Sequence, residues 1–207
     1  MATRRDEIRE KALHDLQRFE VLMLDGHFDY GNGFHGRVYL NPHQLFRSPS
    51  TIWRFAQDLL DLLPAELIER TEVVAGPATG GALLAHTIAG LMDSRRRLGH
   101  PACSFAPFSV DPLEGPTLRR FYRDLMSGRQ VLLADDVRNT GQTFQRCAAA
   151  IAEAGGTLIA TVEIYDRCEA MVDLGVPNFS LAEYGATENY PADDCPLCRA
   201  GVDITAF

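Results

Sequence analysis

The stretch Val131-Leu132-Leu133-Ala134-Asp135-Asp136-Val137-Arg138-Asn139-Thr140-Gly141-Gln142-Thr143 decides the fold of this chain. Its apolar first part predicts a buried strand that ends in two adjacent carboxylates, and a polar loop then leads into a helix over 141–154. Backbone N–H groups at the start of such a helix can bind a phosphate without any lysine. The two carboxylates repel a phosphate unless they face ribose hydroxyls or the waters of a bound Mg²⁺. The stretch therefore predicts a site for a phosphorylated sugar that carries a metal ion.

Strands and helices alternate on both sides of this stretch. The expected helices, besides 141–154, cover residues 3–20, 50–63 and 80–92. The expected strands cover residues 72–75, 102–108, 117–121, 130–134, 157–165 and 179–181, and small strands and turns fill 21–40. This alternation predicts an α/β fold with a doubly wound, mainly parallel sheet. Ligands of such sheets collect at the carboxyl ends of the strands.

A second strand-to-helix loop, Val73-Val74-Ala75-Gly76-Pro77-Ala78-Thr79-Gly80-Gly81, is expected at the same edge of the sheet. Its glycines permit a close approach between backbone and ligand. The same pattern also suits an ordinary strand-to-helix turn.

The composition argues against several classes of protein, namely nucleic-acid-binding, membrane-spanning and disulfide-rich proteins. The formal net charge of -8 argues against non-specific binding of nucleic acid, which needs a basic face. No apolar run approaches the roughly 20 residues of a membrane span, and the charged N-terminus lacks an apolar signal region. The odd number of cysteines, five, suits reduced thiols better than a disulfide framework. We therefore expect a cytoplasmic protein without membrane or nucleic-acid partners.

The first loop closely resembles the phosphoribosyl pyrophosphate (PRPP) signature of the type I phosphoribosyltransferases, and the second resembles their pyrophosphate loop. The resemblance implies that Asp135 and Asp136 are catalytic: they hold the ribose hydroxyls, and the Mg²⁺ through PRPP or water. It further implies PRPP contacts at Asn139, Thr140, Gly141, Gln142, Thr143, Ala78, Thr79, Gly80 and Gly81. An acidic turn that caps a helix is the alternative for the first loop.

Three further segments resemble the orotate phosphoribosyltransferases. Gly26-His27-Phe28 with Gly33 and Tyr39 looks like the N-terminal hood that covers the base. Asp166-Arg167 matches a pair whose arginine holds the orotate carboxylate, because a guanidinium matches a carboxylate in bidentate fashion. The resemblance thus implies base contacts at Arg167, Phe28 and Tyr39. A surface ion pair of Arg167 with Glu169 or Asp173 is the alternative.

The third segment is the tail Cys195-Pro196-Leu197-Cys198-Arg199-Ala200-Gly201-Val202, which looks like that of one bacterial branch of these enzymes. Cys195 and Cys198 also have the spacing of half a zinc site, although a full site needs about four ligands. Two reduced cysteines in a packed tail are the simpler alternative.

The resemblance implies a single domain over residues 1–207, with the hood at about 1–45, the α/β core at about 46–190 and the tail at 191–207. It implies a homodimeric pentosyltransferase of pyrimidine biosynthesis, which converts orotate and PRPP into orotidine 5'-phosphate and pyrophosphate with Mg²⁺.

The chain departs from the family where a mobile loop normally carries lysines. Residues 105–116 hold no base and two acids, Asp111 and Glu114, and Lys11 is the only lysine of the chain. We expect Arg119 and Arg120 to balance the charge of the leaving group instead, and Arg95–Arg97 to be a solvated helix end. Gly31 stands where a lysine that contacts the base is expected. A transferase for another nucleobase, or a catalytically weak PRPP-binding regulatory protein, is therefore an alternative.

Overall fold

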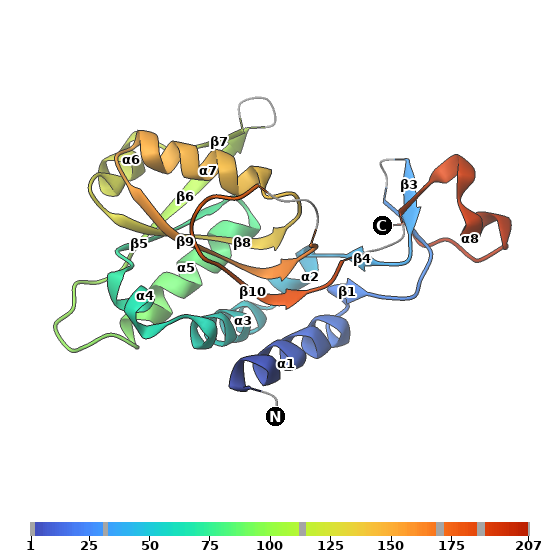
Figure 1. The fold of residues 1–207 in the computed structure, drawn as a ribbon, viewed down its shortest axis with the longest axis horizontal. Helices are drawn as coiled ribbons and strands as arrows, with labels where there is room; N and C mark the ends of the chain where they lie inside the picture. The colour runs from blue at the N-terminus through green and yellow to red at the C-terminus, as the bar shows by residue number, and fades with distance from the viewer. Residues whose placement is uncertain (1–2, 31–32, 112–114, 169–171, 186–188, 207) are drawn as a thin grey trace.

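The computed structural model describes residues 3–30, 33–111, 115–168, 172–185 and 189–206. A central sheet carries helices on both faces, and a group of small strands stands to one side of it, close to the C-terminus (Figure 1). This arrangement confirms the predicted α/β fold with a small hood.

The central sheet has six strands and is parallel except at one edge, where β7 runs antiparallel to β6. In spatial order the strands are β10 (Asn178–Glu183), β9 (Thr157–Asp166), β8 (Gln130–Arg138), β5 (Val73–Pro77), β6 (Ser104–Asp111) and β7 (Gly115–Thr117). The chain leaves β5 toward β6 and leaves β8 toward β9, so the direction of winding reverses between β5 and β8. Ligands of open α/β sheets bind at such a reversal.

Strand β8 is buried on both faces because its alternate side chains enter two different cores. Leu132 and Ala134 pack into the larger apolar cluster, under α1, α3 and α5. Val131 and Leu133 pack into the second cluster, with side chains of α6 and α7. The apolar run therefore builds a central strand that delivers Asp135 to the ligand edge.

Most predicted elements are present with small shifts of their ends. The helices are α1 (Arg4–Arg18), α2 (His43–Phe46), α3 (Pro49–Leu62), α4 (Ala65–Arg70), α5 (Gly80–Asp93), α6 (Arg120–Met126), α7 (Gln142–Glu153) and α8 (Pro196–Arg199). The prediction of a strand over 117–121 was wrong. β7 ends at Thr117, Leu118 turns into the second core, and α6 begins at Arg120.

The hood is built from both ends of the chain. β1 (Leu22–Met23) pairs with β4 (Tyr39–Leu40), and β3 (Phe34–Gly36) lies between β2 (Phe28–Asp29) and β11 (Asn189–Pro191). A 3₁₀ turn at Ala192–Asp194 and then α8 follow β11. The backbone of Thr205 donates to His27 O at 2.8 Å and accepts from Asp29 N at 2.9 Å, so the tail closes against β2.

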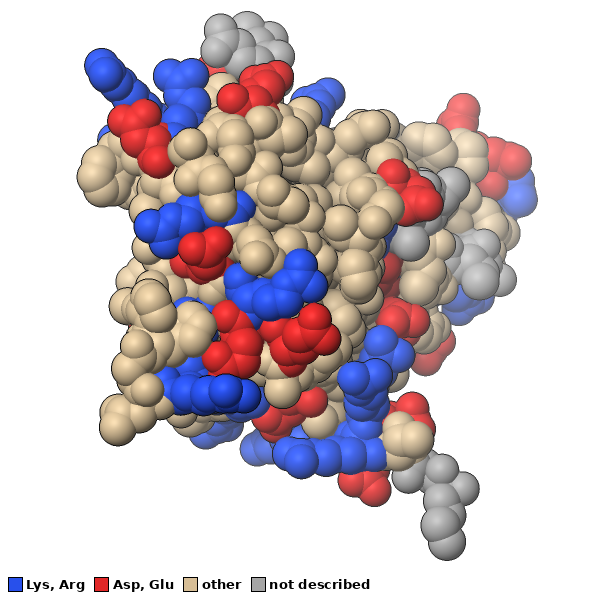
Figure 2. Space-filling model, turned by 60° about the vertical axis from the view of Figure 1, so that its left-hand side comes forward, with Lys and Arg blue, Asp and Glu red and all other residues tan. Residues whose placement is uncertain are grey.

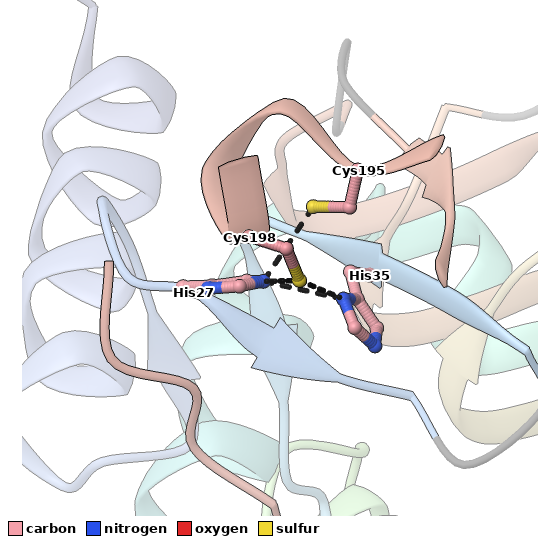
Figure 3. Close-up of side chains that lie close together, drawn as sticks. All are labelled: His27, His35, Cys195 and Cys198. Carbon is pink, nitrogen blue, oxygen red and sulfur yellow. Dashed lines mark hydrogen bonds between the residues drawn. The ribbon is translucent and has the colours of Figure 1, made fainter. Parts of the chain in front are cut away.

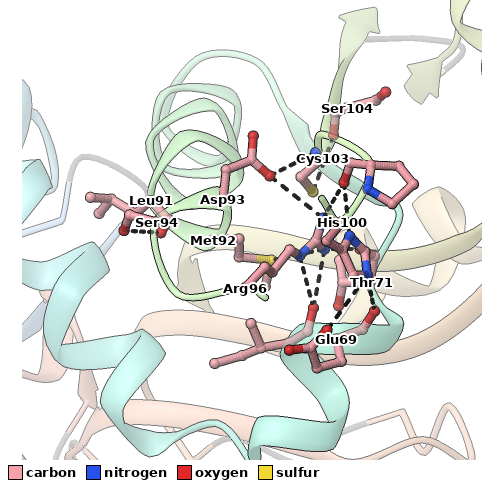
Figure 4. Close-up of polar contacts among 12 residues, drawn as sticks. Glu69, Thr71, Leu91, Met92, Asp93, Ser94, Arg96, His100, Cys103 and Ser104 are labelled. Carbon is pink, nitrogen blue, oxygen red and sulfur yellow. Dashed lines mark hydrogen bonds and ion pairs between the residues drawn. The ribbon is translucent and has the colours of Figure 1, made fainter. Parts of the chain in front are cut away.

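The prediction that Arg95–Arg97 form a solvated helix end is wrong for Arg96. Its side chain is 2% exposed. It donates to the carbonyl oxygens of Ile68, Thr71 and Pro101, so it caps the end of α4 (Figure 4). Arg95 pairs with Asp61 and Gln57. Of the three arginines 95–97, only Arg97 is exposed. This basic cluster therefore holds α4 to the segment after α5.

We expect Arg96→Met to lower the free energy of unfolding by about 2–4 kcal/mol, because the substitution leaves buried carbonyl oxygens without donors. Chemical denaturation measures the change. The matched control is Arg97→Met, which should fall within about 0.5 kcal/mol of the unchanged protein. Equal stability of the two variants would contradict the capping role of Arg96.

The charged surface is mixed in sign. On the face drawn in Figure 2, basic and acidic side chains are interspersed. Surface ion pairs such as Arg129–Glu72 join charges of opposite sign. That face offers no extended basic area of the kind that binds nucleic-acid backbones. Within the described ranges, no helix combines the length and apolar character that a bilayer crossing requires.

Candidate active site

The acidic pair lies where β8 reaches the edge of the sheet. Asp135 is 8% exposed, and its Oδ1 accepts the backbone N–H of Asp136 at 2.9 Å. The carboxylate of Asp136 is half-buried and accepts from Val137 N at 3.0 Å. Burial, reinforced by the charge of Asp136, raises the pKa of Asp135 well above its usual value. The pair is therefore suited to hydroxyl donors or a cation that offsets its charge.

The glycine loop after β5 packs directly on this pair. A Cβ at Gly80 would lie 2.4 Å from Asp136 Oδ2, and one at Gly81 would lie 2.7 Å from Asp135 Oδ1 and 2.8 Å from Ala134 O. Only glycine allows this contact. Ala78 and Thr79 are exposed at the turn, and the peptide bond between them is cis. The structure thus brings the two predicted loops together.

The loop after β8 surrounds a cavity of about 140 Å³. Gly141 has φ +82° and directly precedes α7, so the first backbone N–H groups of this helix face the loop. The cavity is lined by Asp135, Val137, Arg138, Asn139, Thr140, Gly141, Gln142, Thr143 and Phe144. All five residues predicted to bind phosphate after β8 are among them.

Arg138 is a site residue that the sequence analysis missed. Arg138 is only 8% exposed, and its Nη2 donates to Val172 O at 3.3 Å. Nε is buried without a hydrogen-bond partner among the described residues. Both nitrogens lie within 3.7 Å of the point where a Cβ of Gly141 would stand. A positive charge thus lies beside the phosphate-loop glycine; the signal was an arginine at the end of an apolar strand.

A larger cavity, of about 610 Å³, lies between the hood and the sheet edge. It is lined by Tyr30, Phe34, Val38, Tyr39, Leu40, Pro42, Val137, Asn139, Tyr165, Arg167 and Asn189. Val137 and Asn139 line both cavities, so the two are neighbours. Of the predicted base contacts, Arg167 and Tyr39 line this cavity. Phe28 does not, because it is buried behind Tyr39 at a ring-centroid distance of 5.7 Å.

Arg167 is positioned by the end of β9. Its backbone N–H donates to Arg138 O at 3.0 Å, which ties it to β8. The preceding Asp166 is buried, and its Oδ1 accepts from Cys168 N at 2.8 Å. Nη1 of Arg167 is 3.5 Å from Asn139 Oδ1, at the junction of the two cavities. The positively charged guanidinium of Arg167 therefore lines the larger cavity, directly beside the loop after β8.

Known proteins align in sequence with almost the whole length of this chain. An orotate phosphoribosyltransferase of Caldanaerobacter subterraneus is 30% identical over 196 residues, 95% of each chain. One of Erythrobacter litoralis is 34% identical over 174 residues, 84% of each chain. The chain belongs to the orotate phosphoribosyltransferase family. No family model matches it.

The fold agrees with that of solved family members. The structure of orotate phosphoribosyltransferase from Aeropyrum pernix superimposes with a TM-score of 0.62 at 21% identity, covering 82% of this chain and 92% of the other. At this identity the likeness establishes the type I phosphoribosyltransferase fold.

The antiparallel strands β6 and β7 contain most of the stretch 105–116 in which the resemblance implies a mobile loop. Arg119 and Arg120 follow it at the start of α6, where both are exposed and line neither cavity. Glu114 and Gly31 lie outside the described residues. Lys11 is held on α1 by Asp58 at 2.7 Å and Asp15 at 3.4 Å, so it stays away from the hairpin.

A second buried acid lies beside Asp135 beneath the site. Glu163 on β9 is fully buried and stands opposite Asp135 in the register of β8 and β9. Asn178 donates to its Oε1 at 2.7 Å, and Oε2 has no partner among the described residues. Burial raises the pKa of Glu163 to about 8, so the folded protein holds its proton at neutral pH.

We expect Glu163→Gln to flatten the dependence of stability on pH. Because the folded pKa of Glu163 exceeds its ordinary value of 4.5, the free energy of unfolding falls as pH rises from about 4.5 to about 8. The slope from one such group is at most about 1.4 kcal/mol per pH unit. Denaturation between pH 5 and about 8 measures it. Asp135 should leave a residual slope of the same sign.

The matched control is Glu153→Gln at the exposed end of α7, which should keep the full slope. If Glu163→Gln and Glu153→Gln gave the same slope, Glu163 would be ionised in the folded protein.

Proposed function

We propose that the protein transfers the phosphoribosyl group of PRPP to orotate, giving orotidine 5'-phosphate and pyrophosphate in pyrimidine biosynthesis. Family membership supports the reaction. The observation that carries it for this chain is the junction of the two cavities at Val137 and Asn139. One cavity offers backbone amides for a phosphate, and the other offers Arg167 for a carboxylate, as the two substrates require.

The phosphoribosyl half of the reaction falls to the two loops. The N–H groups at the start of α7 and the hydroxyls of Thr140 and Thr143 bind the 5'-phosphate, and Arg138 adds positive charge beneath them. Asp135 and Asp136 accept hydrogen bonds from the ribose hydroxyls, and their negative charge favours the oxocarbenium character that develops at C1. The backbone at Thr79–Gly81 holds the pyrophosphate.

The acidic pair fits Mg²⁺ because hard carboxylate oxygens are the donors that this ion takes. Asp135 and Asp136 would hold it through water or through the PRPP hydroxyls. When bound, Mg²⁺ neutralises charge on the pyrophosphate that leaves. The raised pKa of Asp135 supports this assignment, since two carboxylates packed together are stabilised by a cation.

Arg167 binds the orotate carboxylate. Its guanidinium offers two parallel N–H donors, which match a planar carboxylate. Tyr39 and Tyr30 close the hood side of the cavity. The base is thereby held with its ring toward the junction, where C1 of the ribose arrives, so the two reacting atoms meet without diffusion.

Arg119 and Arg120 supply the charge that lysines supply elsewhere in the family. Since they line neither cavity within one chain, the proposal includes a homodimer in which this hairpin serves the neighbouring subunit. It also includes a cytoplasmic location, which the five free cysteines support.

We expect the purified protein to consume orotate when PRPP and Mg²⁺ are present, measured by the loss of orotate absorbance. Arg167→Ala should raise the KM for orotate roughly 10- to 100-fold, the effect of losing about 1.4–2.8 kcal/mol of carboxylate binding. Its affinity for PRPP should stay near that of the unchanged protein.

Two outcomes would redirect the proposal. PRPP binding without orotate turnover, followed by turnover of another nucleobase, would indicate a different acceptor. PRPP binding without turnover of any base would favour a regulatory protein, the role suggested by the absence of bases from the hairpin residues 105–116.

We expect Gly80→Ala to weaken the binding of Mg-PRPP roughly 10- to 100-fold, because the added methyl displaces the Asp136 carboxylate from its position 2.4 Å away. Isothermal titration calorimetry measures the affinity. Gly90→Ala on the same helix is the control, since nothing lies within 4 Å of its Cβ. It should bind PRPP normally and gain up to about 1 kcal/mol of stability. If Gly80→Ala and Gly90→Ala bound PRPP with equal affinity, the position of Asp136 would have no role in PRPP binding.

A further inference from the structure

Four side chains that can bind a metal converge within the hood. They are His27, His35, Cys195 and Cys198, and their ligand atoms all lie within 4.8 Å of one another (Figure 3). His27 directly precedes β2, His35 lies in β3, and the two cysteines belong to the tail around α8. About 160 residues separate the two pairs along the chain, so only the fold brings them together.

Four of the six distances between the ligand atoms match those between ligands of one tetrahedral zinc ion. With Zn–S near 2.3 Å and Zn–N near 2.05 Å, the tetrahedral angle places S and N about 3.6 Å apart and two N atoms about 3.3 Å apart. In the protein, Nε2 of His27 is 3.5 Å from Cys195 Sγ and 3.6 Å from Cys198 Sγ. Nδ1 of His35 is 3.4 Å from Cys198 Sγ and 3.2 Å from His27 Nε2.

The hydrogen bonds around the cluster leave its nitrogens ready to bind. Nδ1 of His27 is 2.9 Å from Val202 O, a carbonyl that can only accept. This contact places the proton on Nδ1 and turns the lone pair of Nε2 inward. The other ring nitrogen of His35, Nε2, is 4.0 Å from Asp29 Oδ1. His27 thus directs Nε2 at the cluster and Nδ1 at a backbone acceptor outside it, as histidines that bind metals do, while Nε2 of His35 faces the side of Asp29.

Hydrogen bonding within the cluster does not account for this geometry. Nε2 of His27 has a single in-plane lone pair, and three polar atoms lie within 3.6 Å of it. One lone pair accepts one good hydrogen bond. A cation at the common centre satisfies every ligand at once.

We propose that one zinc ion binds at this centre, held by His27, His35, Cys195 and Cys198. Two thiolates and two neutral imidazoles in tetrahedral geometry are a preferred donor set for zinc. The two thiolate charges cancel that of the ion, so the assembly tolerates burial. Three of the residues are buried, and Cys198 is exposed. With four protein ligands the site is closed, which makes it structural rather than catalytic.

The ion fastens the C-terminal tail to the hood. β2 and β3 are two and three residues long, and such short strands are marginal without further support. Phe34 of β3 and Asn189 of β11 line the larger cavity. Zinc therefore stabilises the wall of that cavity. It is distinct from the Mg²⁺ proposed at Asp135, since oxygen ligands suit Mg²⁺ and sulfur ligands suit zinc.

Metal analysis and cobalt substitution test the proposal. Protein purified under reducing conditions with zinc supplied should hold one zinc ion per chain by elemental analysis. After a chelator removes it, Co²⁺ should bind with equal stoichiometry and give thiolate-to-cobalt charge-transfer bands together with the visible bands of tetrahedral Co²⁺. Reloading with zinc should restore the melting temperature that the chelator lowered. This experiment needs no variant.

Cys198→Ser is the sharpest variant because Cys198 is the exposed ligand, so its replacement leaves the buried packing intact. It should lose stoichiometric zinc and weaken the charge-transfer bands. Cys103→Ser, half-buried and outside the cluster, is the matched control and should retain both. His35→Asn should also lose the ion while both thiols remain.

Either of two results would overturn the proposal. One is folded, reduced protein that binds neither zinc nor Co²⁺ with thiolate bands. The other is a Cys195–Cys198 disulfide in protein alkylated immediately after lysis. None of these measurements depends on orotate turnover, so failure of the zinc site and failure of the proposed activity are distinguishable.

Discussion

The contact between the glycine loop and the acidic pair is the constraint on which the site depends. Asp135 and Asp136 lie against Gly80 and Gly81 so closely that any Cβ there would meet a carboxylate oxygen at 2.4 or 2.7 Å. β5 and β8 must be neighbours for this to happen, and the winding of the sheet must reverse between them. The loop proposed to hold pyrophosphate and the acids proposed to bind the ribose would then face one substrate.

This contact also brings buried carboxyl groups close together, and burial disfavours their charged forms. Asp135 and Glu163 are both buried, and burial raises the pKa of each. Arg138 lies within the same region, beneath Gly141. The cation and the sugar hydroxyls proposed for this site would stabilise the ionised form of these carboxyl groups.

The hood depends on contacts between the two ends of the chain. Its strands are too short to be stable alone, so it draws on both ends of the chain. The tail supplies β11, the backbone pairing of Thr205, and the two cysteines of the proposed zinc site. The same small structure forms one wall of the larger cavity. The base binding proposed for this cavity would therefore depend on the stability of a segment far from β8 in sequence.

The sequence by itself determined whatever depends on neighbouring residues. The apolar run 131–134, the acids after it and Gly141 specify a strand, a loop and a helix start, because periodicity and backbone conformation are local properties. The central strands, most of the helices and most of the residues that line the smaller cavity after β8 were predicted on that basis. Only the tertiary structure decided that Arg96 caps α4, that Arg138 lies beneath Gly141, and that His27 and His35 meet Cys195 and Cys198. These depend on which distant segments pack together, and the spacing of residues along a chain carries no record of that packing.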